Sequence, residues 1–163
     1  MNIKAAVVTV SDRASLGERE DISGPTAVRL LEEAGVQVLE TAVVHDDVRA
    51  IAEAIQNVAY EEIDVVITTG GTGITPQDYT ARAMDPLLRF EIPGIAEAIR
   101  FKGVQKGVPG ALLSRGRAGV MVGGKNRTLI INLAGSVSAV EDGMEVIIPI
   151  LPHAAKQMRG ADH

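Results

Sequence analysis

The chain has 163 residues and a formal net charge of -5; 46% of its residues are hydrophobic, only 2% are aromatic, and none is cysteine. This length suits one domain over residues 1–163, with a core of small aliphatic side chains that is typical of a parallel sheet covered by helices. The composition excludes disulfides and thiolate chemistry, and it disfavours nucleic acid as a partner, because it offers neither a basic backbone field nor aromatic stacking platforms.

The first third of the chain alternates apolar and helical patterns. Residues 3–10 are apolar and β-branched and predict a strand, followed by a polar loop over 11–17. Residues 23–25 (Ser-Gly-Pro) carry helix-start chemistry, and apolar residues at helical spacing then continue to Gly35. Residues 36–44 predict the second strand.

A second helix and a third strand follow. Asp46 or Asp47 can cap a helix whose apolar stripe runs over 48–58. The apolar run 63–67 then predicts a buried parallel strand that leads directly into the glycine-rich segment 69–78.

This glycine-rich segment is the most specific motif in the chain. It reads Thr-Thr-Gly-Gly-Thr-Gly from residue 68 and carries a carboxylate at Asp78. Glycines let backbone amides approach phosphate oxygens, so the motif predicts an anion site with Asp78 placed to hold a metal beside it. A glycine-rich surface turn is the alternative for a lone Gly-Gly-x-Gly.

The remaining elements are shorter. Residues 80–88 predict a helix that Pro86 kinks or divides, 92–94 predict a turn, and 95–101 predict a further helix. We expect Arg159 to His163 to form a frayed tail.

Two short strands and a last helix complete the pattern. Residues 120–122 and 128–133 predict strands joined by a tight turn. Residues 119–126 nearly match a nucleotide phosphate loop, but Asn126 replaces the magnesium-binding hydroxyl and a strand follows, so a hairpin is the better interpretation. Residues 134–136 lead into a helix that Pro149 and Pro152 interrupt.

Strands that alternate with helices predict an α/β fold, a three-layer doubly wound and mostly parallel sheet. Ligands of such folds bind at the carboxyl ends of the strands, which places the loops after Val10, Val44, Thr69 and Leu133 at one edge. No apolar run approaches about 18 residues, and the first ten residues lack signal-peptide character, so we expect no membrane segment and a cytoplasmic protein.

Several motifs in order resemble the Mog/MoaB family of molybdenum cofactor biosynthesis. They are the glycine-rich segment with Asp78, Ser11-Asp12-Arg13-Ala14-Ser15, Asp21-Ile22-Ser23-Gly24-Pro25, His45-Asp46-Asp47, Pro93-Gly94-Ile95-Ala96-Glu97, Leu113-Ser114-Arg115 and Asn132-Leu133-Ala134-Gly135-Ser136. The resemblance implies a trimeric molybdopterin-binding α/β domain. Its catalytic members are molybdopterin adenylyltransferases, which use Mg²⁺ and ATP to adenylate the terminal phosphate of molybdopterin, and a molybdenum insertion protein is a possible partner.

Candidate site residues follow from this resemblance. Asp46 and Asp78 are the catalytic candidates and the Mg²⁺ ligands, since Mg²⁺ takes one or two carboxylates together with phosphate oxygens. The expected substrate-binding residues are Ser11, Asp12, Thr69, Gly70, Gly71, Thr72, Gly73, Glu97, Ser114, Arg115, Gly135 and Ser136. Taken individually, each of the pterin-pocket candidates outside the glycine loop also suits a capping or turn role.

Departures from the family pattern keep other functions open. Ala134 and Val137 stand where the family usually has prolines, and Phe90 stands where an Arg is common. A non-catalytic MoaB-type binding or scaffold protein is therefore the alternative to the enzyme. An adenylyltransferase of a tungsten pathway is a third possibility, because adenylation precedes metal insertion.

Overall fold

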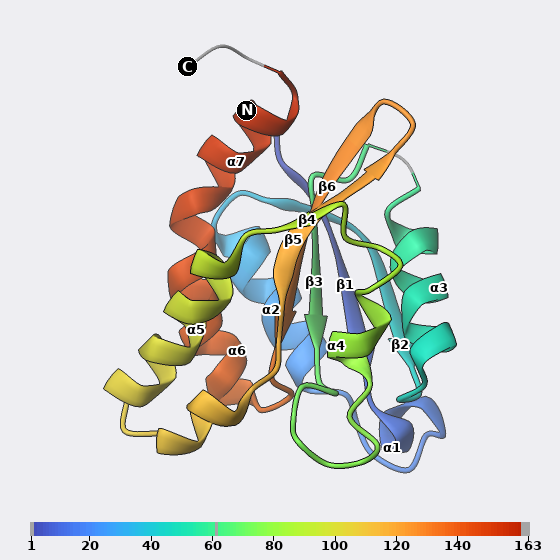
Figure 1. The fold of residues 1–163 in the computed structure, drawn as a ribbon, viewed down its shortest axis with the longest axis vertical. Helices are drawn as coiled ribbons and strands as arrows, with labels where there is room; N and C mark the ends of the chain where they lie inside the picture. Colours follow the sequence, from blue (N-terminus) through green and yellow to red (C-terminus); the bar gives the residue numbers. More distant parts are fainter. Residues whose placement is uncertain (1, 61, 161–163) are drawn as a thin grey trace.

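A computed structural model describes residues 2–60 and 62–160 (Figure 1). Its centre is a six-stranded sheet of order β2-β1-β3-β6-β5-β4. The strands are β1 (Lys4–Val10), β2 (Gln37–Val44), β3 (Val65–Thr69), β4 (Phe90–Glu91), β5 (Ala118–Gly123) and β6 (Asn126–Leu133). Strands β2, β1, β3 and β6 pair in parallel, whereas β5 runs antiparallel to both β6 and β4. The predicted mostly parallel, doubly wound sheet is confirmed.

Helices cover both faces of the sheet and complete three layers (Figure 1). On one face lie α2 (Ser23–Glu33), α5 (Pro93–Gln105), α6 (Val137–Ile147) and α7 (Leu151–Met158). On the other lie α3 (Val48–Val58) and α4 (Thr80–Ala83). Asp47 caps α3, because its Oδ2 accepts the Ala50 N–H at 2.8 Å, and this leaves the Asp46 carboxylate available to the site.

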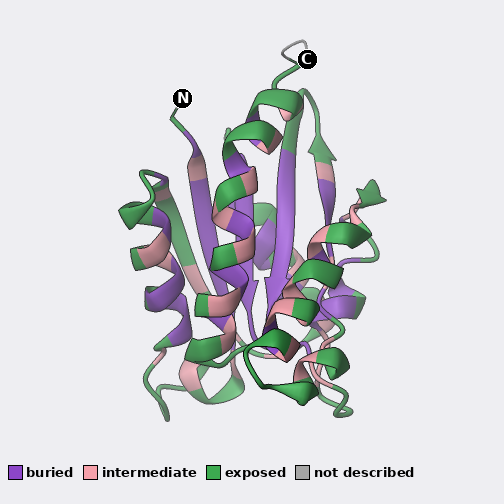
Figure 2. Ribbon diagram, turned by 90° about the vertical axis from the view of Figure 1, so that its left-hand side faces the viewer, coloured by how far each residue is buried: buried purple, intermediate pink, exposed green. Residues whose placement is uncertain are grey.

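The continuous apolar strands reflect burial on both faces. Val65 and Ile67 of β3 belong to the core beneath α2 and α6, whereas Val66 between them belongs to the core beneath α3. Successive side chains of a strand point to opposite faces, so a strand covered on both sides needs apolar residues at every position. Figure 2 shows these strands buried between exposed helix surfaces.

Several predicted boundaries were wrong. The 11–17 segment contains a helical turn, α1 (Asp12–Ser15), and α4 is far shorter than the predicted 80–88 helix. Helix α5 begins at Pro93, where a turn was predicted, because proline suits the first helical turn. After Ile147 the chain continues through a 3₁₀ turn, η2 (Ile148–Ile150), into α7. The two-residue strand β4 and a 3₁₀ helix, η1 (Pro109–Leu113), were not predicted.

Two further predictions concern chain ends and turns. The hairpin is confirmed, since Gly123 pairs with Asn126 across the antiparallel β5 and β6. The predicted fraying is wrong for Arg159, whose Nε donates to Asp64 Oδ1 at 3.0 Å and whose Nη2 donates to the Asn2 carbonyl at 2.9 Å. Asp64 is only 6% exposed, so the ion pair holds this residue against the sheet. The rest of the predicted tail lies outside the described residues, except for Gly160.

Candidate active site

The glycine loop after β3 packs so tightly that side chains cannot replace its hydrogens. Gly70 and Gly71 adopt φ values of +92° and +66°, in the region that favours glycine. A Cβ on Gly70 would lie 2.2 Å from the Val10 carbonyl oxygen, and one on Gly71 would lie 2.2 Å from Thr80 Oγ1. The bare backbone is therefore required, as the phosphate-site prediction assumed.

Below the loop, hydrogen bonds fasten it to α4 and to β6. Thr80 Oγ1 donates to the Gly70 carbonyl at 2.9 Å, and the Gly70 N–H donates to the Leu133 carbonyl at 2.9 Å. The predicted ligand Thr69 is fully buried, and its Oγ1 lies 2.9 Å from Ser23 Oγ. Thr69 thus ties the end of β3 to α2, and it is not part of the cavity lining.

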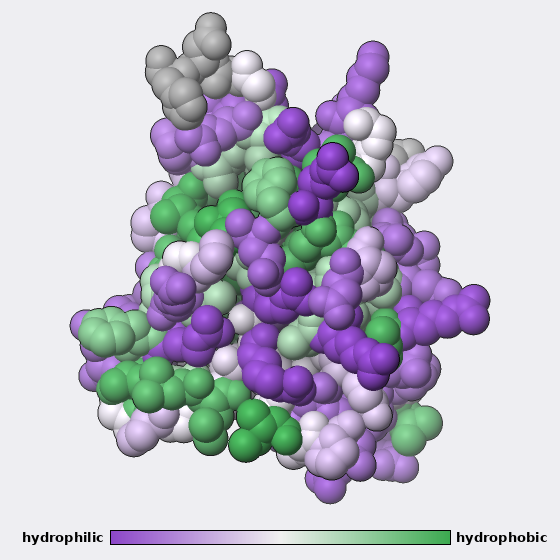
Figure 3. Space-filling view, in the orientation of Figure 1, coloured by the Kyte–Doolittle hydropathy of each residue, from purple (hydrophilic) through white to green (hydrophobic). Residues whose placement is uncertain are grey.

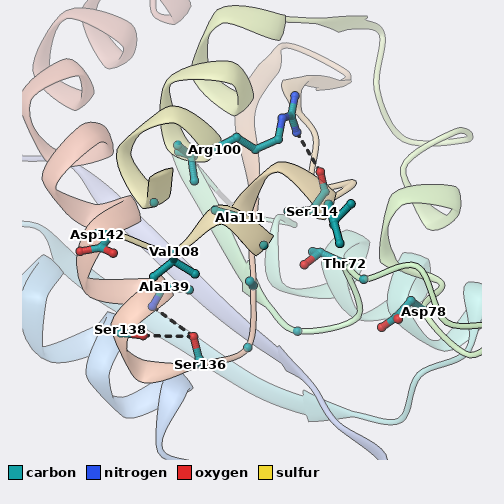
Figure 4. Close-up of a pocket in the computed structure, with 18 of the residues that line it drawn as sticks. Thr72, Asp78, Arg100, Val108, Ala111, Ser114, Ser136, Ser138, Ala139 and Asp142 are labelled. Atoms are coloured by element: carbon teal, nitrogen blue, oxygen red, sulfur yellow. Dashed lines mark hydrogen bonds between the residues drawn. The ribbon is translucent and has the colours of Figure 1, made fainter. Parts of the chain in front are cut away.

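A cavity of about 490 Å³ opens above the loop, between α5, η1 and the start of α6 (Figure 4). Its lining includes these predicted site residues: Gly70, Gly71, Thr72, Gly73, Asp78, Ser114, Gly135 and Ser136. The start of α6 is well formed, because Ser136 Oγ accepts the Ala139 N–H at 3.2 Å. Glycine amides and a helix N-terminus at one end of a cavity suit an anionic group.

Asp78 stands at one side of this cavity with one oxygen already bound. Its Oδ2 accepts the Thr75 N–H at 3.0 Å and the Thr75 hydroxyl at 2.7 Å. A Cβ on Gly73 would lie 2.6 Å from the same oxygen, so the carboxylate lies directly against the glycine loop.

Asp46 also lies against the loop, at Gly71. A Cβ on Gly71 would come 3.0 Å from Asp46 Oδ2, and Asp46 Oδ1 accepts the Tyr79 N–H at 3.0 Å. Asp12 Oδ1 accepts the Asp46 N–H at 2.8 Å and holds this corner together. Burial raises the pKa of Asp46; the Tyr79 N–H partly offsets this, and the charges of Asp78 and Asp12 raise the pKa further.

These carboxylates fit Mg²⁺. Within residues 2–60 and 62–160, Asp46 Oδ2 and Asp78 Oδ1 accept no hydrogen bond, so each side chain has one oxygen to offer. In that part of the chain, no three His, Cys, Asp or Glu side chains gather as a metal site. Mg²⁺ does not need such a cage, because it usually takes one or two carboxylates and fills its octahedron with phosphate oxygens and water. A cation would also relieve the repulsion that raises the pKa of Asp46.

Arg115 clamps the glycine loop from above. Its N–H donates to the Thr72 carbonyl at 2.8 Å, its Nε to the Gly73 carbonyl at 2.7 Å, and its Nη2 to the Asp78 carbonyl at 2.7 Å. The planar guanidinium thereby ties the two ends of the 73–78 segment together. Its position suggests that Arg115 positions Asp78 through the backbone.

We expect Arg115→Ala and Arg115→Lys both to slow the reaction of this site by about 10- to 100-fold, because a single ammonium cannot replace a guanidinium fork. Amide hydrogen exchange at residues 73–78 should accelerate in both variants. Arg127→Lys, on the exposed part of β6, is the matched control. Unchanged exchange and rate in Arg115→Lys would contradict the clamp.

Other predicted residues lie outside the lining of this cavity. Asp46 and Arg115 contact the glycine loop, and Asp12 binds the Asp46 backbone, as described. Ser11 caps α1 through its Oγ and lines a neighbouring cavity that shares Gly135 and Ser136 with the first. Glu97 lies on the exposed side of α5.

Two charged residues of the lining, Arg100 and Asp142, were not predicted. Arg100 Nη1 donates to the Ser114 and Gly116 carbonyls at 3.2 and 3.0 Å and holds η1 against α5. Asp142 lies four residues after Ser138 of the same lining, so both lie on one face of α6, but no local pattern singles out either residue.

Fold and site together define an α/β domain in which a glycine loop with carboxylates against it opens into a cavity. A family model described as probable molybdopterin binding domain matches residues 6–153. The chain belongs to this family, in its Mog/MoaB branch, and the resemblance seen in its motifs is confirmed.

Individual relatives agree with the family match. A molybdopterin adenylyltransferase of Pyrococcus furiosus is 38% identical, covering 96% of this chain and 91% of that protein. Among solved structures, a molybdopterin biosynthesis protein of Mycobacterium abscessus has a TM-score of 0.88 at 43% identity, covering 94% of both chains. The tungsten cofactor synthesizing protein MoaB of Pyrococcus furiosus has a TM-score of 0.89 at 35% identity, covering 97% of this chain and 98% of that one. Throughout the described ranges, no helix has the length and apolar character needed to cross a membrane.

Proposed function

We propose that this protein is a molybdopterin adenylyltransferase, which transfers AMP from Mg²⁺-ATP to the terminal phosphate of molybdopterin in molybdenum cofactor biosynthesis. The observation that carries the proposal is the glycine loop with the Asp46 and Asp78 carboxylates against it, beside a cavity large enough for a small ligand. The name of the Pyrococcus furiosus relative supports the same reaction.

The reaction needs no protein nucleophile. A terminal phosphate oxygen of molybdopterin attacks the α-phosphorus of ATP, the bond from that phosphorus to the bridging oxygen breaks, and pyrophosphate leaves. The protein aligns the two phosphates and offsets their charge, which can supply most of the acceleration in phosphoryl chemistry. Glycine-loop amides and the start of α6 bind phosphate oxygens, and Arg115 keeps the loop in place. When bound at Asp46 and Asp78, Mg²⁺ would supply the neutralising charge.

The direct test is to incubate the purified protein with molybdopterin, ATP and Mg²⁺ and to follow adenylated molybdopterin by mass spectrometry, together with pyrophosphate release. We expect product only when all three are present, and none after chelation of Mg²⁺. Molybdopterin that binds but stays unchanged would contradict the enzyme and favour the scaffold protein.

The second candidate, a MoaB-type binding or scaffold protein, is favoured by the changed loop at Ala134 and Val137. Loss of two prolines removes backbone restraint next to the Ser136 cap. An adenylyltransferase of a tungsten pathway is favoured only by the name of the MoaB structure from Pyrococcus furiosus. Product formation separates the scaffold from both enzymes.

We further propose that residues 1–163 act as one domain, in a cytoplasmic homotrimer that passes its product to a molybdenum insertion protein. These proposals rest on the family resemblance. Sedimentation over a dilution series should give a constant trimer mass, and a mass that falls with dilution would contradict a stable trimer.

A further inference from the structure

The cavity has two chemically different ends. At one end are the glycine loop and the capped start of α6, where Ser136, Ser138 and Ala139 line the wall. At the other end Asp142 lines the wall, roughly 9 Å further along the helix axis at 1.5 Å per residue. Figure 4 shows Asp142 and Asp78 on opposite sides of the cavity. The amide-rich end suits a phosphate, and the carboxylate end suits a hydrogen-bond donor.

The wall between these ends is apolar. It is formed by Ile99 of α5, by Val108, and by Ala111 and Leu113 of η1. Gly103 allows this arrangement, because a Cβ there would lie 2.4 Å from the Ala111 Cβ, so only glycine lets η1 approach α5 this closely. The rim continues as exposed apolar side chains over η1, with Leu112 63% and Leu113 56% exposed (Figure 3). An apolar wall between polar ends suits a flat heterocycle.

Asp142 is half-buried and has no partner of its own. Within the described ranges its carboxylate accepts no hydrogen bond and forms no ion pair. The lysines that face α6 from α5 are engaged elsewhere: Lys102 and Lys106 both pair with Glu145, the latter at 3.2 Å. A ligand that fills the cavity would displace water from this carboxylate, and N–H donors on the ligand would offset the cost of that displacement.

We propose that Asp142 determines pterin specificity by accepting hydrogen bonds from the N3–H and the 2-amino group of the pterin. This inference rests on the proposed function and assigns the orientation of molybdopterin in the cavity. The amino-pyrimidinone edge presents two parallel N–H donors, which match the two oxygens of one carboxylate, as a guanidinium does. The phosphate then lies at the glycine loop, the heterocycle contacts Ile99 and Val108, and the amino-pyrimidinone edge meets Asp142.

The test compares two stable probes that differ only at this edge. Pterin-6-ylmethyl phosphate carries the 2-amino group, and lumazine-6-ylmethyl phosphate carries an oxygen acceptor in its place. Dissociation constants for both are measured by calorimetry on the native protein, on Asp142→Asn, and on the control Glu141→Gln, an exposed neighbour on the same helix. Adenylation of molybdopterin is measured in parallel on all three.

We expect the native protein and Glu141→Gln to bind the pterin at least about tenfold more tightly than the lumazine, and Asp142→Asn to reduce this preference to within about threefold. The lumazine probe also checks the fold of Asp142→Asn. A correctly folded variant should bind this probe at least as tightly as the native protein does. If the native protein adenylates molybdopterin and Asp142→Asn keeps the full preference for the pterin probe, the role of Asp142 is overturned and the proposed function stands. Absence of adenylation and of pterin binding in the native protein would overturn both this role and the proposed function.

Discussion

Replacing Asp78 by Asn should lower the rate of adenylated molybdopterin formation by about 10²- to 10³-fold, while the protein stays folded. Oδ2 of this carboxylate accepts two hydrogen bonds from Thr75, whereas Oδ1 accepts none within the described residues. An amide oxygen can keep those bonds, but it brings no negative charge to a cation. The loss therefore isolates the charge of Asp78 from its structural contacts.

The measurement for Asp78→Asn is the initial rate at saturating ATP over a range of Mg²⁺ concentrations. Asp47→Asn is the matched control, since Asn caps a helix about as well as Asp and Asp47 caps α3 outside the cavity. Binding of Mg²⁺ should also raise the melting temperature of the native protein more than that of the variant. A variant with the native rate at every Mg²⁺ concentration would show that Asp78 has no part in the reaction.

Asp46→Asn should lower the rate of adenylated molybdopterin formation about as much as Asp78→Asn does. It should also raise the melting temperature at neutral pH. Burial and the neighbouring Asp78 and Asp12 raise the pKa of Asp46 in the folded protein. A raised pKa favours folding below the ordinary value and loses that contribution as the pH rises through the folded value. At pH 7 the charged carboxylate therefore costs stability, and a neutral amide that still accepts the Tyr79 N–H removes that cost.

The expected gain is small, because Asp46 is only partly buried and solvent screens its charge. We expect less than about 1 kcal/mol, or up to about 2–4 °C in melting temperature. The difference between Asp46→Asn and the native protein should shrink as the pH falls below the ordinary Asp range, where native Asp46 is protonated. Thermal unfolding without Mg²⁺ at pH 7 and at about pH 3 checks this. A variant less stable than the native protein at pH 7 would contradict the electrostatic account.

The local sequence pattern was sufficient to predict the main strands and the positions in the loop that must be glycine. The apolar run before the glycine loop predicts a strand covered on both faces, and β3 is buried at every position. Boundaries failed where tertiary contacts decide. Helix α4 ends at Ala83, after which the chain turns to meet the β5 edge through the Arg89 N–H and the Val120 carbonyl. A pairing with a strand 31 residues later is invisible to local periodicity.

The candidate site residues show the same difference between local and tertiary determinants. Glycines and capping residues, such as Gly70 and Ser136, are recognisable from sequence because their roles depend on neighbours in the chain. The roles of long polar side chains were less accessible. Arg115 was expected to bind substrate, and the structure shows that its side chain binds the Gly73 and Asp78 carbonyls of the loop. Thr69 was expected at the ligand, and the structure places its hydroxyl against Ser23.

The sequence by itself determined the α/β class, the glycine loop and the family. The class follows from strand and helix patterns that alternate along the chain, and the loop and the family follow from short motifs in order. Only the tertiary structure decided that Asp46 and Asp78 both lie against that loop, and that Asp142 lines the far end of the cavity. The physical reason is that parallel strands align their carboxyl ends at one edge, which brings together loops distant in sequence. The hydrogen-bond partners of long side chains then depend on which groups the fold brings near them, and spacing along the chain does not predict this.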